Sequence, residues 1–131
     1  MLGIDTNVLV RLLVEDDAEQ TRRAQALVER TVTRGEDILV SLLVVIETEW
    51  VLRSRYGLEK STSIRTFRAL LETREMLFED EVSIEQALFD WTDSAAGFSD
   101  CLISARNLRL GCTATATFDQ KASRLRGFVR A

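Results

Sequence analysis

Short apolar runs alternate with longer helical patterns along this chain, and that alternation constrains the fold more than any other feature. The runs predict strands at residues 1–5, 38–40, 76–78 and 112–116, with a possible edge strand at 128–129. The stretches between them predict helices over about 6–14, 16–33, 42–56, 61–73, 84–94, 98–110 and 119–125, with Ser41 and Ser83 among the N-caps. Strands separated by helices are typical of a parallel sheet that helices cover on both faces. We therefore expect an α/β fold with a central parallel sheet.

The length and composition indicate a single domain that spans residues 1–131. A hydrophobic content of 46% and a charged content of 29% are ordinary for a globular protein and argue against disorder. The chain has no apolar run long enough to span a bilayer and no pattern of a secretory signal. We expect a cytoplasmic protein.

The complete absence of histidine narrows the possible chemistry. It excludes Ser-His-Asp and Cys-His catalysis and histidine-ligated zinc. The formal net charge of −4 is also unusual for a protein that binds nucleic acid. If the chain handles RNA, the attraction must be local, through metal ions or through arginines such as Arg11, Arg53 and Arg55. Those arginines could equally be ordinary residues of solvated helix faces.

Two acidic residues, Asp5 and Asp119, directly follow predicted strands. Ligands bind at the carboxyl ends of the strands in an open α/β sheet, so both side chains are candidates for a functional site. The alternative is that each residue only caps the helix that follows it.

Two further acidic residues lack obvious partners. Glu47 lies in the middle of a predicted helix among apolar neighbours one turn away, whereas Glu49 has Arg53 four residues on. An unpaired carboxylate in apolar surroundings must meet a cation or hydrogen-bond donors, unless it lies at the exposed edge of the helix. Asp100 begins another helix without a basic neighbour, and the helix dipole alone could explain its position.

Carboxylates gathered at one edge of a sheet would repel one another. Two of them about 4 Å apart interact unfavourably by roughly 4 kcal/mol at an effective dielectric constant of 20. A divalent metal offsets this repulsion, and oxygen ligands without histidine or cysteine favour Mg²⁺ or Mn²⁺. Such an ion activates water and holds a phosphate, so phosphodiester hydrolysis needs no histidine.

Four segments of the chain resemble, in order, the motifs of PIN-domain ribonucleases of the VapC toxin type, from VapBC toxin–antitoxin pairs. They are Ile4–Leu9, Ile46–Leu52, Phe98–Ile103 and Thr117–Asp119. The resemblance implies a three-layer α/β/α sandwich and Mg²⁺-dependent endonucleolytic cleavage of RNA. It also implies inhibition by a cognate VapB-like antitoxin, and homodimers are common in the family.

The resemblance also implies roles for individual residues. It assigns the metal ligands and catalytic carboxylates to Asp5, Glu47, Asp100 and Asp119, with Asn7 and Thr117 as supporting residues. Many relatives carry a further acidic residue where this chain has Gly97, and Asp93 lies one turn upstream of that position.

Two other functions stay open at this point. An Asp-nucleophile phosphatase of the haloacid-dehalogenase type would use Asp5 as its nucleophile, but such enzymes need a second Asp where this chain has Asn7. A phospho-aspartate intermediate would identify it. A PIN-like interaction module without activity would bind no Mg²⁺.

Overall fold

The computed structural model describes residues 1–131 and contains six α-helices, one 3-10 helix and five strands. The chain forms two compact units, an N-terminal unit (Met1–Glu79) and a C-terminal unit (Asp80–Ala131). All strand pairs are parallel, as predicted, and they form two groups, β1–β2–β3 and β4–β5.

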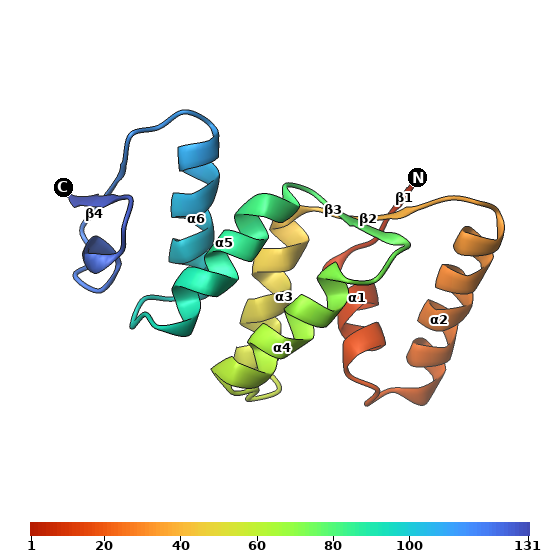
Figure 1. The fold of residues 1–131 in the computed structure, drawn as a ribbon. Helices are drawn as coiled ribbons and strands as arrows, with labels where there is room; N and C mark the ends of the chain where they lie inside the picture. Colours follow the sequence, from red (N-terminus) through yellow and green to blue (C-terminus); the bar gives the residue numbers. More distant parts are fainter. The chain divides into compact units, whose positions relative to one another are not determined.

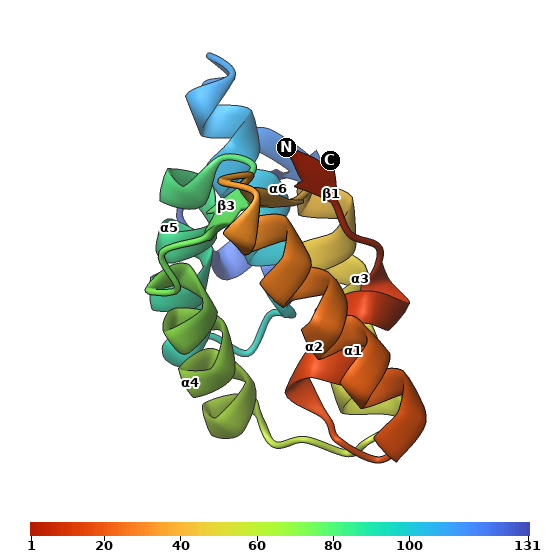
Figure 2. The same ribbon diagram turned by 90° about the vertical axis from the view of Figure 1, so that its right-hand side faces the viewer.

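The N-terminal unit combines a three-stranded parallel sheet with four helices (Figure 1). Its strands are β1 (Leu2–Gly3), β2 (Ile38–Val40) and β3 (Met76–Phe78), and its helices are α1 (Thr6–Leu13), α2 (Ala18–Thr33), α3 (Leu42–Ser54) and α4 (Lys60–Leu71). The central strand β2 buries Ile38 and Val40 completely on one face and Leu39 partly on the other, so its sequence is apolar without alternation. Helix α1 packs against both α2 and α3, as Figures 1 and 2 show.

Side-chain caps set where the helices of the N-terminal unit begin. The Asp17 carboxylate accepts a hydrogen bond from the Gln20 amide at 3.0 Å at the start of α2. The Ser41 hydroxyl accepts one from the Val44 amide at 3.4 Å at the start of α3. The Ser41 cap was predicted from the sequence, because Ser and Asp satisfy amides that have no partner within the helix.

The C-terminal unit is built on two packed helices, α5 (Glu81–Thr92) and α6 (Phe98–Arg109). The rings of Trp91 and Phe98 lie 5.2 Å apart, centroid to centroid, where the chain passes from one helix to the other. Two short strands, β4 (Thr115–Thr117) and β5 (Phe128–Arg130), then pair in parallel on either side of a 3-10 turn, Ala122–Arg124.

Two predicted helices of the C-terminal unit differ from the structure. Helix α5 begins three residues earlier than predicted, because Asp80 rather than Ser83 is its N-cap and accepts hydrogen bonds from the Ser83 amide and hydroxyl. The segment 119–125 is not an α-helix but a single 3-10 turn. It ends because Leu125 takes an extended conformation, with φ −73° and ψ 145°.

None of the helices has both the length and the apolar character needed to cross a membrane.

Candidate active site

Asp5 lies at the carboxyl end of β1, where the chain turns into α1. Its Oδ1 atom accepts a hydrogen bond from the Val8 amide at 3.0 Å, so Asp5 does cap the helix, as the capping alternative proposed. The side chain is exposed and Oδ2 makes no hydrogen bond. One oxygen of Asp5 therefore fixes the turn, and the other is free to bind a ligand.

The structure brings Asp5 together with Glu47 in one pocket of the N-terminal unit, which we call the acidic pocket. Its volume is about 340 Å³. The residues that line it are Asp5, Thr6, Asn7, Glu47, Trp50, Val51 and Arg55. The two carboxylates thus share a site with one guanidinium, which only partly balances their charge.

Glu47 does not lie in the apolar surroundings that its neighbours in the sequence suggested. Glu47 is exposed, and its neighbours on that face of α3 are exposed as well, with Leu43 79% and Trp50 54% accessible. Of the two glutamates in this helix, the buried one is Glu49, which is 4% exposed and pairs with Arg53 at 3.1 Å. Glu47 reaches the acidic pocket from the exposed edge of the helix, so no burial penalty acts on it.

A buried hydroxyl at the acidic pocket lacks a partner. Thr6 is 7% exposed, and its Oγ1 atom makes no hydrogen bond. An unsatisfied buried hydroxyl is unfavourable, so Thr6 has a hydrogen-bonding capacity that the protein itself does not fill. The donors around this point are carboxylate, amide and hydroxyl oxygens, which Mg²⁺ and Mn²⁺ prefer. The residues present therefore fit a hydrated divalent ion.

The other two predicted carboxylates belong to the C-terminal unit. Asp100 lies in the first turn of α6, is partly buried and has no hydrogen-bond or ion-pair partner. Asp119 is exposed and its Oδ1 atom accepts a hydrogen bond from the Ala122 amide at 2.8 Å, so its side chain closes the turn that precedes the 3-10 helix. The Thr117 hydroxyl accepts from the Asp119 amide at 3.0 Å, so Thr117 holds the backbone of Asp119.

The predicted set of four carboxylates is thus divided between the units, two in each. Asp93 is an exposed residue at the C-cap of α5. Within neither unit do three or more acidic or cysteine side chains gather in a group that could hold a metal ion.

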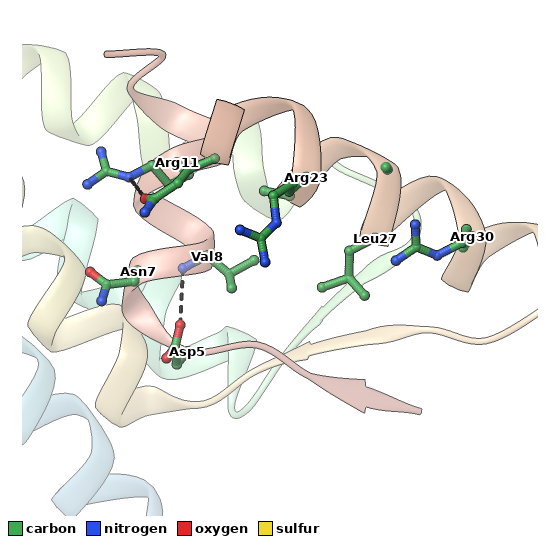
Figure 3. Close-up of a pocket in the computed structure, with 10 residues that line it drawn as sticks. Asp5, Asn7, Val8, Arg11, Arg23, Leu27 and Arg30 are labelled. Atoms are coloured by element: carbon green, nitrogen blue, oxygen red, sulfur yellow. Dashed lines mark hydrogen bonds between the residues drawn. The ribbon is translucent and has the colours of Figure 1, made fainter. Parts of the chain in front are cut away.

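A second, larger pocket in the N-terminal unit also includes Asp5. It lies between α1 and α2, has a volume of about 560 Å³ and is lined by three arginines, Arg11, Arg23 and Arg30 (Figure 3). We call it the arginine groove. A hydrogen bond from Arg11 to the Tyr56 hydroxyl, at 3.1 Å, raises the pKa of Arg11 and holds its guanidinium in place.

Comparison with known families assigns the chain to a class. The model of the PIN domain matches residues 3–127, so this chain belongs to the PIN domain family. PIN domains are generally nucleases and usually act with a divalent metal. The match confirms the predicted fold class, a PIN-like α/β/α fold with parallel strands. A search of curated proteins gave no significant match.

Some residues that share a pocket with Asp5 were not predicted from the sequence. Thr6 and Trp50 line the acidic pocket, and Arg23 and Arg30 line the arginine groove. A signal for the two arginines was present, because they lie seven residues apart, two turns along one face of a helix.

Proposed function

We propose that this PIN domain is a divalent-metal-dependent endoribonuclease. One observation carries the proposal: Asp5 and Glu47, which come from two different motifs, line the same acidic pocket. A pocket with two carboxylates and one guanidinium is a poor site for an anionic substrate unless a cation binds first. Its oxygen donors match the ions that nucleases of this family usually use.

Asp5 and Glu47 would hold the ion. Asp100 and Asp119 are proposed as further carboxylate ligands on the resemblance of their motifs alone. The bound ion would supply Lewis-acid activation of water and of the phosphate. The chain's own residues then orient the substrate. Asp5 is fixed by its hydrogen bond to the Val8 amide, which keeps one carboxylate oxygen at a constant position in the pocket. Arg55, at the rim, carries a charge that can bind a neighbouring phosphate.

The test is cleavage of a fluorescently labelled single-stranded RNA by the purified chain. We expect cleavage with Mg²⁺ or Mn²⁺, none in excess EDTA, and a loss of about 100-fold or more in Glu47→Gln, because a metal ligand contributes several kcal/mol to the transition state. Glu29→Gln is the matched control, since Glu29 is an exposed helical glutamate that lines neither pocket. Full activity in EDTA would refute the proposal.

We propose further that the enzyme is the toxin of a VapBC-type pair, acts as a homodimer and is inhibited by a VapB-like antitoxin. The support is the resemblance of its four motifs, in order, to those toxins. Induced expression should arrest bacterial growth, and co-expression of a VapB-like protein encoded beside this gene should relieve the arrest. Growth unaffected by the chain, with active protein present in the cells, would count against a toxin.

The phosphatase alternative has less support. It needs a general acid two residues after Asp5, and the structure places the amide of Asn7 there, in the same pocket. An amide cannot donate a proton in the way a carboxylic acid does.

A further inference from the structure

The arginine groove presents free positive charge next to Asp5. Arg23 and Arg30 both line it from α2, both are exposed, and neither makes a hydrogen bond or an ion pair. Arg11, in contrast, is held by Asp16, by Gln20 and by Tyr56. Two guanidinium groups in this groove therefore have all their donors available for a ligand.

The charge of the groove is opposite to that of the whole chain. Three arginines and one carboxylate, Asp5, are its charged residues, whereas the chain as a whole carries −4. Positive charge concentrated on one face of an acidic protein attracts anions to that face only. The groove is thus the place where an otherwise repelled polyanion can approach the N-terminal unit.

The spacing of the two free arginines suits a ligand with repeated anionic groups. Arg23 and Arg30 lie seven residues apart on one face of α2, which places them about 10 Å apart along the helix axis. Leu27 lies between them on the same face, and Val8 faces it from α1 (Figure 3). Alternating cationic and apolar positions match the phosphates and the sugar or base faces of a nucleic acid strand.

The arginine groove is continuous with the acidic pocket. This continuity favours an RNA strand over an acidic protein segment as the ligand of the groove. Asp5 and Asn7 line both pockets, so a strand with one phosphodiester at Asp5 would pass directly into the groove. An acidic peptide has no phosphodiester to place at a cation bound by Asp5, so nothing would extend it from the groove to that residue.

We infer that the arginine groove between α1 and α2 binds the backbone phosphates of single-stranded RNA next to the cleavage site, through Arg23 and Arg30. This inference rests on the proposed function for the identity of the substrate. It makes Arg23 and Arg30 substrate-positioning residues, because they act on the strand away from the bond that is cut. Arginine suits this task, since its planar guanidinium can donate two parallel hydrogen bonds to one phosphate.

The test measures RNA binding separately from cleavage. Fluorescence anisotropy of a labelled single-stranded RNA in excess EDTA reports binding by the intact chain, at several salt concentrations. For Arg23→Gln/Arg30→Gln we expect an affinity at least about tenfold lower, because charge-assisted hydrogen bonds are lost. The slope of log K against log salt should fall by about 1.4, since each phosphate contact on a single strand contributes about 0.7.

The matched control is Arg22→Gln, compared with Arg23→Gln alone, because each removes one positive charge from α2 but only Arg23 lines the groove. Arg22→Gln should change affinity little. With Mg²⁺ present, the double variant should raise KM and leave kcat nearly unchanged, as expected when ground-state and transition-state binding are lost equally. All three arginines are exposed, so circular dichroism should show the same melting curve for every variant.

The outcomes separate this inference from the proposed function. Unchanged RNA affinity and salt slope in the double variant would overturn the inference, even if the enzyme cleaves RNA with Mg²⁺; the groove would then be open to a protein partner. Equal losses in Arg22→Gln, or no RNA binding by the wild type at low salt, would overturn it as well. Arginine-dependent binding by a chain that never cleaves RNA would support the inference while refuting the proposed function.

Discussion

Single residues at the candidate site combine structural and chemical tasks. Asp5 caps α1 through Oδ1 and leaves Oδ2 free in the acidic pocket. The two tasks have different requirements, because capping needs only an acceptor oxygen, whereas binding a cation benefits from the full negative charge. They can therefore be separated by a substitution that keeps the shape and removes the charge.

Asp5→Asn should abolish activity without destabilising the protein. Asn caps helices about as well as Asp, so the melting temperature should stay close to that of the wild type. RNA cleavage in Mg²⁺ should fall by about 100-fold or more, because one charged metal ligand is lost. Cleavage assays and thermal melting of the same preparation measure both effects.

The matched control is Asp17→Asn, which makes the same change at the N-cap of α2, outside both pockets. It should leave both activity and stability nearly unchanged. Wild-type cleavage by Asp5→Asn would show that the charge of Asp5 has no part in the reaction.

The sequence predicted which residues are of interest better than it predicted their surroundings. Asp5 and Ser41 were identified as strand-end and cap residues from local preferences, and tertiary contacts did not override these preferences. The spacing of Glu49 and Arg53 predicted their ion pair correctly, but not that Glu49 is buried and Glu47 exposed. Both have apolar neighbours, and only the packing of α3 decides which of those neighbours belong to the core.

At the scale of secondary-structure elements, Asp80 joins the beginning of α5 to the end of α6. Its side chain is 4% exposed and pairs with Arg106 at 2.8 Å and Arg109 at 2.7 Å. It also occupies the left-handed region, with φ 53°, where Asp and Asn are tolerated better than most residues. Burial alone would raise the pKa of Asp80, but hydrogen bonds from Ser83 and Arg106 and the charge of Arg109 outweigh burial and lower it.

Asp80→Asn should destabilise the protein in a pH-dependent way. Because the pKa of Asp80 is lowered in the folded state, the stabilisation is complete above the unfolded value of 3.8 and is lost as the pH falls through the folded value. We expect a loss of about 1–2 kcal/mol at pH 7, limited because both arginines are partly exposed. Thermal melting should show a difference from the wild type that shrinks below pH 3.8. A difference that stays constant down to pH 2, or none at pH 7, would contradict the role of this ion-pair cluster.

Gly127 controls how the segment before β5 approaches α6. Its φ is +91°, and a Cβ atom there would lie 2.5 Å from the Ser104 hydroxyl and 3.1 Å from a methyl group of Leu108. Gly127→Ala should therefore be destabilising through both backbone strain and overlap, by about 2–4 kcal/mol in total.

Gly111 is the matched control, because its φ of +99° is similar but a Cβ atom there would meet no atom within 4 Å. Gly111→Ala should therefore lower the stability by only about 1–2 kcal/mol. Denaturant unfolding compares the two, and equal losses would show that the close approach at Gly127 has no energetic weight.

At the scale of the whole molecule, the sequence predicted the fold class and most elements correctly. Alternating strand and helix patterns were sufficient for this, because parallel strands and caps leave local signals. The end of the chain was harder to predict. The segment 119–125 has a helix-like cap at Asp119, but Leu125 and Gly127 adopt conformations that end it after one turn. Asp5 and Glu47 were named from the sequence, and the structure places both in one pocket. The spacing of Arg23 and Arg30 puts them on one face of α2, but it does not say that this face lies against α1.

The central claim is that Asp5 and Glu47 bind one divalent metal ion in the acidic pocket. Calorimetric titration with Mn²⁺ tests it most directly, using the wild type, Asp5→Asn, Glu47→Gln and the double variant. If the residues share an ion, each single substitution should weaken Mn²⁺ binding about tenfold or more, and the two losses should not add in the double variant. Wild-type Mn²⁺ affinity in Glu47→Gln, or losses that add fully, would contradict the claim.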